Sequence, residues 1–167
     1  VERTSTTSFT LTLSATDKAA LNQIMNKNGT SSTSVTTYDV DGAAGFIAAK
    51  AAVSDTGANG ITVSNVAAPT RTAAADDYNS NVLTVTGANF LKKSGAANDI
   101  DVSKLTITGE GGATYTLTSA SDVEITNATT FTITLSATDA AGVEALTSKN
   151  GTSAANGTTY NLAAAED

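Results

Sequence analysis

A stretch of 45 residues occurs twice in this chain at a fixed spacing, and this repetition constrains the fold more than any other feature. Residues 1–45 return without a gap as residues 123–167, each number raised by 122, and about half of the aligned positions are identical. The run Lys-Asn-Gly-Thr-Ser at 27–31, for example, returns at 149–153. A regular period indicates an array of similar units. This period is as long as a domain, so the sequence predicts a tandem-domain protein.

The position of the single proline indicates where one unit ends. Pro69 follows an alternating apolar run at 61–66 and precedes a variable segment at 70–78. A proline between two such segments is typical of a short interdomain joint. We therefore expect residues 1–68 to be the C-terminal part of one repeat, and residues 69–167 to be most of the next repeat without its last strand.

Alternation of apolar and polar residues predicts that the chain is mainly β. Short runs with this pattern are separated by clusters of Gly, Asn and Ser at roughly 10-residue spacing, which is typical of an antiparallel sandwich. The expected strands are 8–13, 61–66, 81–86, 104–108, 113–118, 123–126 and 130–135.

Each repeat also contains one predicted short helix, at residues 14–28 and 136–150. Ser14 is a suitable N-cap, and Asp17 three positions later suits a capping box and the positive end of the helix dipole. An Asn-Gly pair ends each predicted helix, since both residues tolerate the left-handed conformation. Gly142 should weaken the second helix by roughly 1 kcal/mol relative to alanine.

Composition excludes several kinds of chemistry. The chain has no Cys and no His, so it lacks a thiolate nucleophile and the commonest general base and transition-metal ligand. The net charge of −7 disfavours nucleic acid, and no apolar run is long enough to span a bilayer. Ser94 near Lys92 and Lys93 lacks the spacing of a catalytic Ser-Lys pair, so we expect no enzyme and no cofactor.

Asp39 and Asp41 are the candidate metal ligands. The run Asp39-Val40-Asp41-Gly42 has the opening spacing of a calcium loop, although no acidic residue follows at the distance that would close it. The second copy has Asn161 and Ala163 at these positions. Solvated turn residues are therefore the main interpretation of this pair, and calcium bound between neighbouring loops is the alternative.

One short motif resembles a known family. The run Val-Leu-Thr-Val-Thr-Gly-Ala-Asn-Phe at 82–90 is similar to the second strand of bacterial immunoglobulin-like repeats of the IPT/TIG type, and residues 63–70 resemble the joints between such repeats. The resemblance implies an immunoglobulin-like antiparallel β-sandwich from a large bacterial surface or extracellular protein. Such repeats act as stalks, adhesin segments or surface-layer building blocks.

The expected function is therefore structural, in an exported surface or fibre-forming protein. An unfinished sandwich exposes a strand edge that another chain can fill, so we expect self-association, or association with neighbouring repeats, by β-strand complementation. The alternative is an adhesin-type module that binds a glycan or a protein, with or without calcium.

Overall fold

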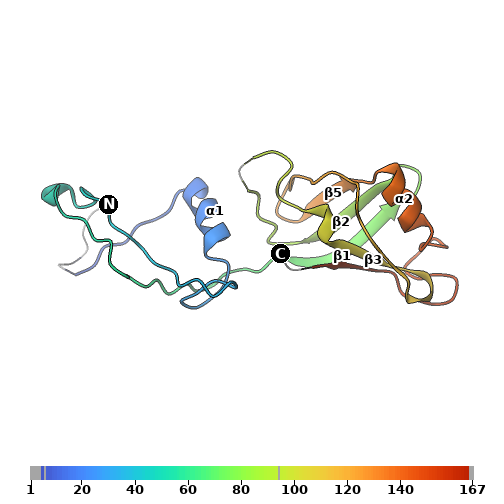
Figure 1. The fold of residues 1–167 in the computed structure, drawn as a ribbon, viewed down its shortest axis with the longest axis horizontal. Coiled ribbons are helices and arrows are strands. Elements are labelled where there is room, and N and C mark those ends of the chain that lie inside the picture. Colours follow the sequence, from blue (N-terminus) through green and yellow to red (C-terminus); the bar gives the residue numbers. More distant parts are fainter. Residues whose placement is uncertain (1–4, 6, 94, 166–167) are drawn as a thin grey trace. The chain divides into compact units, whose positions relative to one another are not determined.

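The computed structural model describes residues 5, 7–93 and 95–165. The chain divides into two compact units, Val1–Ala68 and Pro69–Asp167 (Figure 1). Each unit is described by itself.

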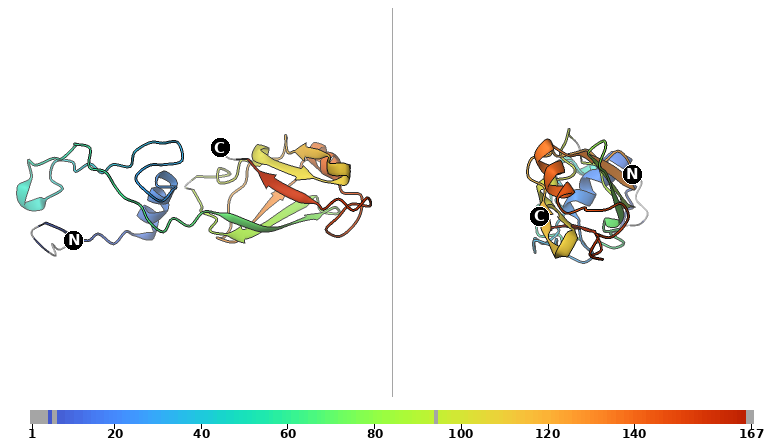
Figure 2. Two further views of the ribbon diagram at one scale, coloured as in Figure 1. Left: turned by 90° about the horizontal axis from the view of Figure 1, so that it is seen from below. Right: turned by 90° about the vertical axis from the view of Figure 1, so that its right-hand side faces the viewer.

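The second unit consists mainly of strands in two antiparallel sheets of three strands each, an arrangement compatible with a β-sandwich (Figures 1 and 2). The first sheet has the order β1 (Thr70–Asp77), β2 (Val82–Ala88), β5 (Thr130–Thr134). The second sheet has the order β4 (Thr114–Thr116), β3 (Leu105–Thr108), β6 (Asn161–Ala164). Two 3-10 turns, η2 (Val102–Lys104) and η3 (Glu110–Gly112), precede and follow β3.

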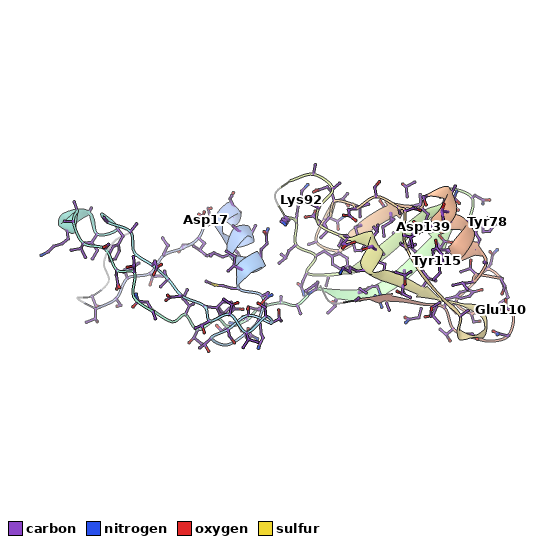
Figure 3. All side chains as sticks on the ribbon, in the orientation of Figure 1. Asp17, Tyr78, Lys92, Glu110, Tyr115 and Asp139 are labelled. Atoms are coloured by element: carbon purple, nitrogen blue, oxygen red, sulfur yellow. The ribbon has the colours of Figure 1, made fainter. Side chains whose placement is uncertain are left out.

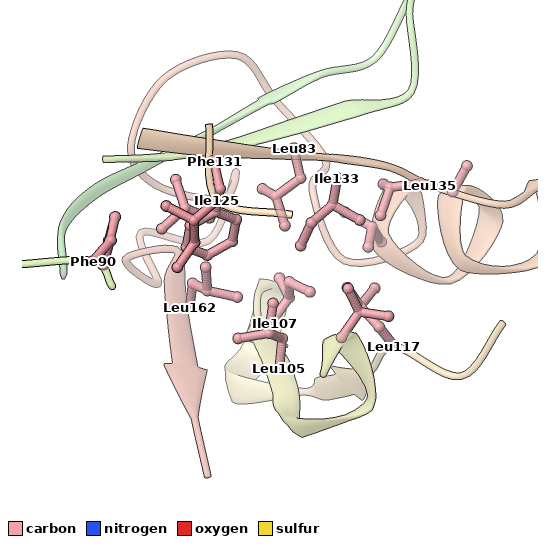
Figure 4. Packing of buried hydrophobic residues seen from close by; sticks show 14 residues of the cluster. Leu83, Phe90, Leu105, Ile107, Leu117, Ile125, Phe131, Ile133, Leu135 and Leu162 are labelled. Carbon is pink, nitrogen blue, oxygen red and sulfur yellow. The ribbon is translucent and has the colours of Figure 1, made fainter. Parts of the chain in front are cut away.

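Alternating side chains of these strands form the hydrophobic core together with side chains of helix α2 (Ala137–Glu144), η2 and the loops (Figure 4). Leu83 and Val85 of β2 lie opposite Ile133 and Phe131 of β5, so the same face of both strands is buried. The rings of Phe90 and Phe131 pack edge to face with centroids 5.2 Å apart. The cluster comprises Leu83, Val85, Phe90, Val102, Leu105, Ile107, Leu117, Ile125, Phe131, Ile133, Leu135, Ala140, Val143 and Leu162.

Each unit contains one α-helix, and both helices are shorter than predicted. Helix α1 spans Ala15–Ile24 and helix α2 spans Ala137–Glu144, so the predicted ends at 28 and 150 are wrong. The predicted N-cap is confirmed, because the hydroxyl of Ser14 accepts a hydrogen bond from the backbone N–H of Asp17. Helix α1 ends early because Met25 leaves helical geometry and the next residue, Asn26, bonds to Thr33 of the following loop.

The first unit has little regular structure in the part of the chain described. Besides α1 it contains the 3-10 turn η1 (Ala48–Lys50) and isolated β-bridges. The predicted strand at 8–13 does not form there with a buried face, since Phe9, Leu11 and Leu13 are exposed. Their counterparts in the second unit are buried because they pack in one cluster with Leu105, Ile107 and Leu162 of the other sheet. Tyr38 is the one buried apolar side chain among the described residues of this unit.

Some strand predictions are correct and others are wrong. Strands β2, β3, β4 and β5 lie within two residues of the predicted ranges. Residues 61–66 and 123–126 form only isolated bridges. Strands β1 and β6 were not predicted, because Ala, Asp and Asn dominate them and these residues have low β-propensity. Backbone pairing with β2 and β3 makes them strands in spite of their composition.

The two copies of the repeat provide a matched test of this core. Ile133→Ala should lower the free energy of unfolding by about 2–5 kcal/mol, because Ile133 is fully buried. The equivalent change Leu11→Ala should have an effect below about 1 kcal/mol, because Leu11 is 57% exposed. Urea unfolding followed by circular dichroism, at a concentration where the chain is monomeric, measures both. Equal losses would contradict the described core.

Candidate functional site

The second unit has a groove along strands β1 and β6, which each end one of its two sheets; we call it the edge groove. Strand β1 ends one sheet and strand β6 ends the other, and no strand in the described part of the chain pairs with the outer edge of either. Two adjoining cavities of about 1110 and 610 Å³ lie along these strands. Arg71 and Leu162 line both cavities, so the two cavities adjoin each other.

The floor of the edge groove is the hydrophobic core itself. The larger cavity is lined by the core residues Leu83, Ile107, Val143 and Leu162. The smaller one is lined by Val85, Phe90, Leu105, Ile125, Phe131 and Leu162. Apolar core side chains therefore border the groove, although each of them is at most 8% exposed.

Strand β1 leaves the groove open because its side chains are small. Ala73, Ala74 and Ala75 stand at its centre, and all eight residues of the strand are exposed. Its last residues are acidic. Partial desolvation of the Asp76 carboxyl raises its pKa, and the nearby carboxylates of Glu144 and Asp77 raise it further. This end of the groove therefore disfavours an additional negative charge.

Strand β6 offers hydrogen-bonding groups to the groove. The backbone N–H of Ala165 donates to the carbonyl of Lys104 at 2.9 Å, which places Ala165 in a hydrogen-bonded pair with the β3 side. Because these groups alternate along an antiparallel strand, residues 161 and 163 also face β3. The N–H and C=O groups of Leu162 and Ala164 consequently face the outer edge, where an added strand would pair.

A buried carboxylate holds helix α2 against the loop that follows β4 (Figure 3). Asp139 has no exposed surface, and it accepts hydrogen bonds from the backbone N–H groups of Thr118 (2.9 Å), Ser119 (3.0 Å) and Ala120. The hydroxyl of Tyr115 donates to it at 2.9 Å. Burial alone would raise the pKa of Asp139, but these hydrogen bonds outweigh burial and hold the pKa well below its ordinary value.

Gly142 explains how Tyr115 reaches this carboxylate. A Cβ atom at Gly142 would lie 2.3 Å from Cε2 of the Tyr115 ring, so any larger residue would displace the ring. The sequence predicted Gly142 only as a weak point of the helix. The first copy has Ala20 at this position, and no local pattern in the sequence reveals that Gly142 lies against Tyr115.

The predicted metal ligands Asp39 and Asp41 lie on the surface of the first unit. Both side chains are exposed, and Oδ1 of Asp39 accepts a hydrogen bond from the N–H of Val40 at 2.9 Å. Among residues 5, 7–93 and 95–165, no three acidic side chains gather into a group that could hold a metal ion. The calcium site therefore remains a prediction without a closing ligand.

The other polar residues singled out in the sequence are engaged in local structure. Lys92 forms an ion pair with Glu124, with 3.2 Å between Nζ and Oε2. Asp99 accepts hydrogen bonds from the backbone N–H groups of Ile125 and Lys93. Ser94 lies outside the described residues.

Comparison with known proteins gives no relative for this chain: no family model matches it, and neither a curated protein nor a solved structure does. Within the described residues, no helix has both the length and the hydropathy that crossing a membrane requires.

The carboxylate of Asp139 should make stability depend on pH. Its pKa is lowered in the folded state, so its contribution is present above the unfolded pKa of about 4 and is lost as the pH falls below that value. Asp139→Asn should therefore destabilise the protein at pH 7, and its difference from wild type should shrink below about pH 4. Thermal unfolding of both proteins between pH 2.5 and 7 measures this.

The matched control for that experiment is Asp17→Asn. Asp17 occupies the same helix position in the first copy, but it is exposed, and its carboxylate accepts a hydrogen bond from the hydroxyl of Ser14 at 2.7 Å. This variant should unfold like wild type throughout the same pH range. A pH-independent loss in Asp139→Asn would show that the charge of the carboxylate is not what stabilises the loop.

The exposed pair Asp39 and Asp41 provides a test for calcium. Since two carboxylates supply too few of the six to eight oxygens that calcium takes, millimolar calcium should leave the melting temperature unchanged. The double variant Asp39→Ala, Asp41→Ala should behave identically. A calcium-dependent rise in wild type that the double variant abolishes would establish the site.

Proposed function

We propose that this chain is a non-enzymatic structural repeat of an exported bacterial surface or fibre-forming protein, which self-associates head-to-tail by β-strand complementation. The observation that carries the proposal is the outer edge of β6, which lies beside an open groove floored by core side chains. A strand added there would pair with the sheet and cover the apolar floor.

The edge of β6 lacks the devices that usually prevent such pairing. Proteins protect sheet edges with charged residues, prolines or bulges. Strand β6 has the sequence Asn-Leu-Ala-Ala, which contains neither a charge nor a proline, and its register with β3 shows no shift. This edge is therefore suited to accept a strand.

The first unit offers a second unpaired surface. Phe9, Leu11 and Leu13 are 62, 57 and 40% exposed, although the same positions in the second unit are core residues. Exposed apolar residues in such a row mark an interaction surface. A chain that has an open strand edge in one unit and an exposed apolar segment in the other has two different contact surfaces. The surface of one copy can therefore bind the other surface of the next copy, head to tail.

The immunoglobulin-like class and the bacterial surface origin rest on the resemblance at 82–90. The two antiparallel sheets are compatible with that class. The absence of Cys and His from the sequence supports a non-enzymatic role, as does the engagement of Asp99, Asp101 and Asp139 with backbone N–H groups. The alternative is an adhesin-type module, for which an extended segment of another protein would occupy the edge groove.

Self-association is the measurable part of the proposal. Sedimentation velocity over a range from micromolar to millimolar chain should show the mean mass rising beyond a dimer, as expected for a contact that does not close on itself. A monomer at every concentration would contradict the proposal.

A matched pair of variants on β6 locates the contact. Ala164 lines the smaller cavity, so Ala164→Lys places a charge inside the edge groove and should weaken association roughly tenfold or more. Ala163 is exposed on the opposite face of the strand, so Ala163→Lys should associate like wild type. Equal effects of the two changes would place the contact elsewhere.

A further inference from the structure

The two copies of the repeat form the same loop after the helix. In the first unit the backbone N–H of Lys27 donates to the hydroxyl of Tyr38 at 3.1 Å, and in the second unit Lys149 donates to Tyr160 at 3.2 Å. The bridge between Ser31 and Thr37 also recurs, between Ser153 and Thr159. Residues 28–40 and 150–162 therefore present their backbones in the same way.

In the first unit this loop carries a pairing segment at residues 59–66. Gly29 and Val63 exchange two backbone hydrogen bonds, of 2.9 and 2.8 Å. The N–H of Ile61 donates to the carbonyl of Tyr38 at 3.1 Å. At the end of the segment, the N–H of Val66 donates to Oδ1 of Asn28 at 2.9 Å.

The equivalent positions in the second unit line the edge groove. Asn150, Gly151, Tyr160 and Leu162 all border the larger cavity, and no strand of the described residues is hydrogen-bonded to them there as residues 59–66 are in the first unit. The burial of the two equivalent tyrosines agrees with the presence of a pairing segment in the first unit alone. Tyr38 is only 4% exposed beside its pairing segment, whereas Tyr160 is half-buried.

We propose that the edge groove binds residues 59–66 of a second copy of this chain. The segment would run antiparallel to β6, with Ile61 opposite Tyr160 and Val63 opposite Gly151, as it does against Tyr38 and Gly29 in its own unit. This proposal rests on the proposed self-association and names the segment and the surface that make the contact.

The side chains of the segment suit the groove. Ile61 and Val63 are two residues apart, so both point to the same face of the strand. This is the face of Tyr38, because directly paired residues on antiparallel strands share a face. In the edge groove that face meets Leu83, Ile107 and Val143. The segment has no charged residue, which suits a groove that has acidic residues at one end.

Burial favours the second copy over the segment's own unit. In the first unit Ile61 and Val63 are only half-buried, since that unit has no apolar core beneath them in its described part. The backbone hydrogen bonds lost there are replaced by equivalent ones on β6. The net gain of the exchange is the apolar surface that both partners remove from water.

Titration of the full chain with a capped synthetic peptide of residues 57–68 tests the proposal. With ¹⁵N-labelled chain kept dilute enough to be monomeric, saturable binding should shift the amide signals of residues 150–162 and slow hydrogen exchange at Leu162. Changes confined to residues 28–40 would overturn the assignment, since the peptide would then only compete for its original site.

Two peptide variants distinguish specific pairing in the groove from nonspecific hydrophobic binding of the peptide. Ile61→Asn together with Val63→Asn changes the inward face and should weaken binding roughly tenfold or more. Thr62→Asn together with Ser64→Asn changes the outward face and should bind like the parent. Equal affinities for the two variants would overturn the proposal.

The outcomes also distinguish this inference from the proposed function. If the chain associates but the peptide neither binds the groove nor dissociates the assemblies, the assignment of residues 59–66 is wrong while self-association stands. If the peptide binds β6 with the expected face preference but the chain stays monomeric at every concentration, the groove assignment stands and head-to-tail association is wrong.

Discussion

The described structure of the second unit depends on one buried carboxylate. Asp139 has no access to water, and a charge in that position is tolerated only when hydrogen bonds replace its hydration. Three successive backbone N–H groups and the Tyr115 hydroxyl provide them. Asp139 thereby fixes helix α2, which follows β5 of one sheet, to the loop that leaves β4 of the other. With the two sheets held in this way, the core is packed between them and the edge groove keeps its shape.

The sequence predicted the parts of the fold that local patterns determine. The alternating strands β2, β3 and β5 and the serine caps follow directly from residue spacing. Strand β1 and the role of Asp139 depend on partners distant in the chain, and no local pattern of residues 70–77 or 136–139 reveals them. The sequence predicted an exposed strand edge but not the edge groove, because the groove is bounded by β1 and β6, which were not predicted.

The two copies show how strongly tertiary partners decide the state of a segment. Leu11 and Ile133 occupy equivalent positions in nearly identical sequences, yet one is 57% exposed and the other is fully buried. Both helices begin at an equivalent serine, but only Asp139 finds donors beyond its own cap. Residues 9–17 and 131–139 differ only at Leu11 and Ile133, so local preference does not explain the difference. In the second unit the core cluster and residues 115–120 provide partners for the equivalent positions.

Because the loop around Tyr38 recurs around Tyr160, the strength of the proposed association should depend on temperature in a particular way. Since the pairing segment leaves one set of backbone partners for an equivalent set, polar enthalpy nearly cancels, and apolar hydration remains as the driving term. That term weakens on cooling. Assemblies held in this way would come apart in the cold and re-form on warming, which is the opposite of the behaviour of contacts built on new hydrogen bonds.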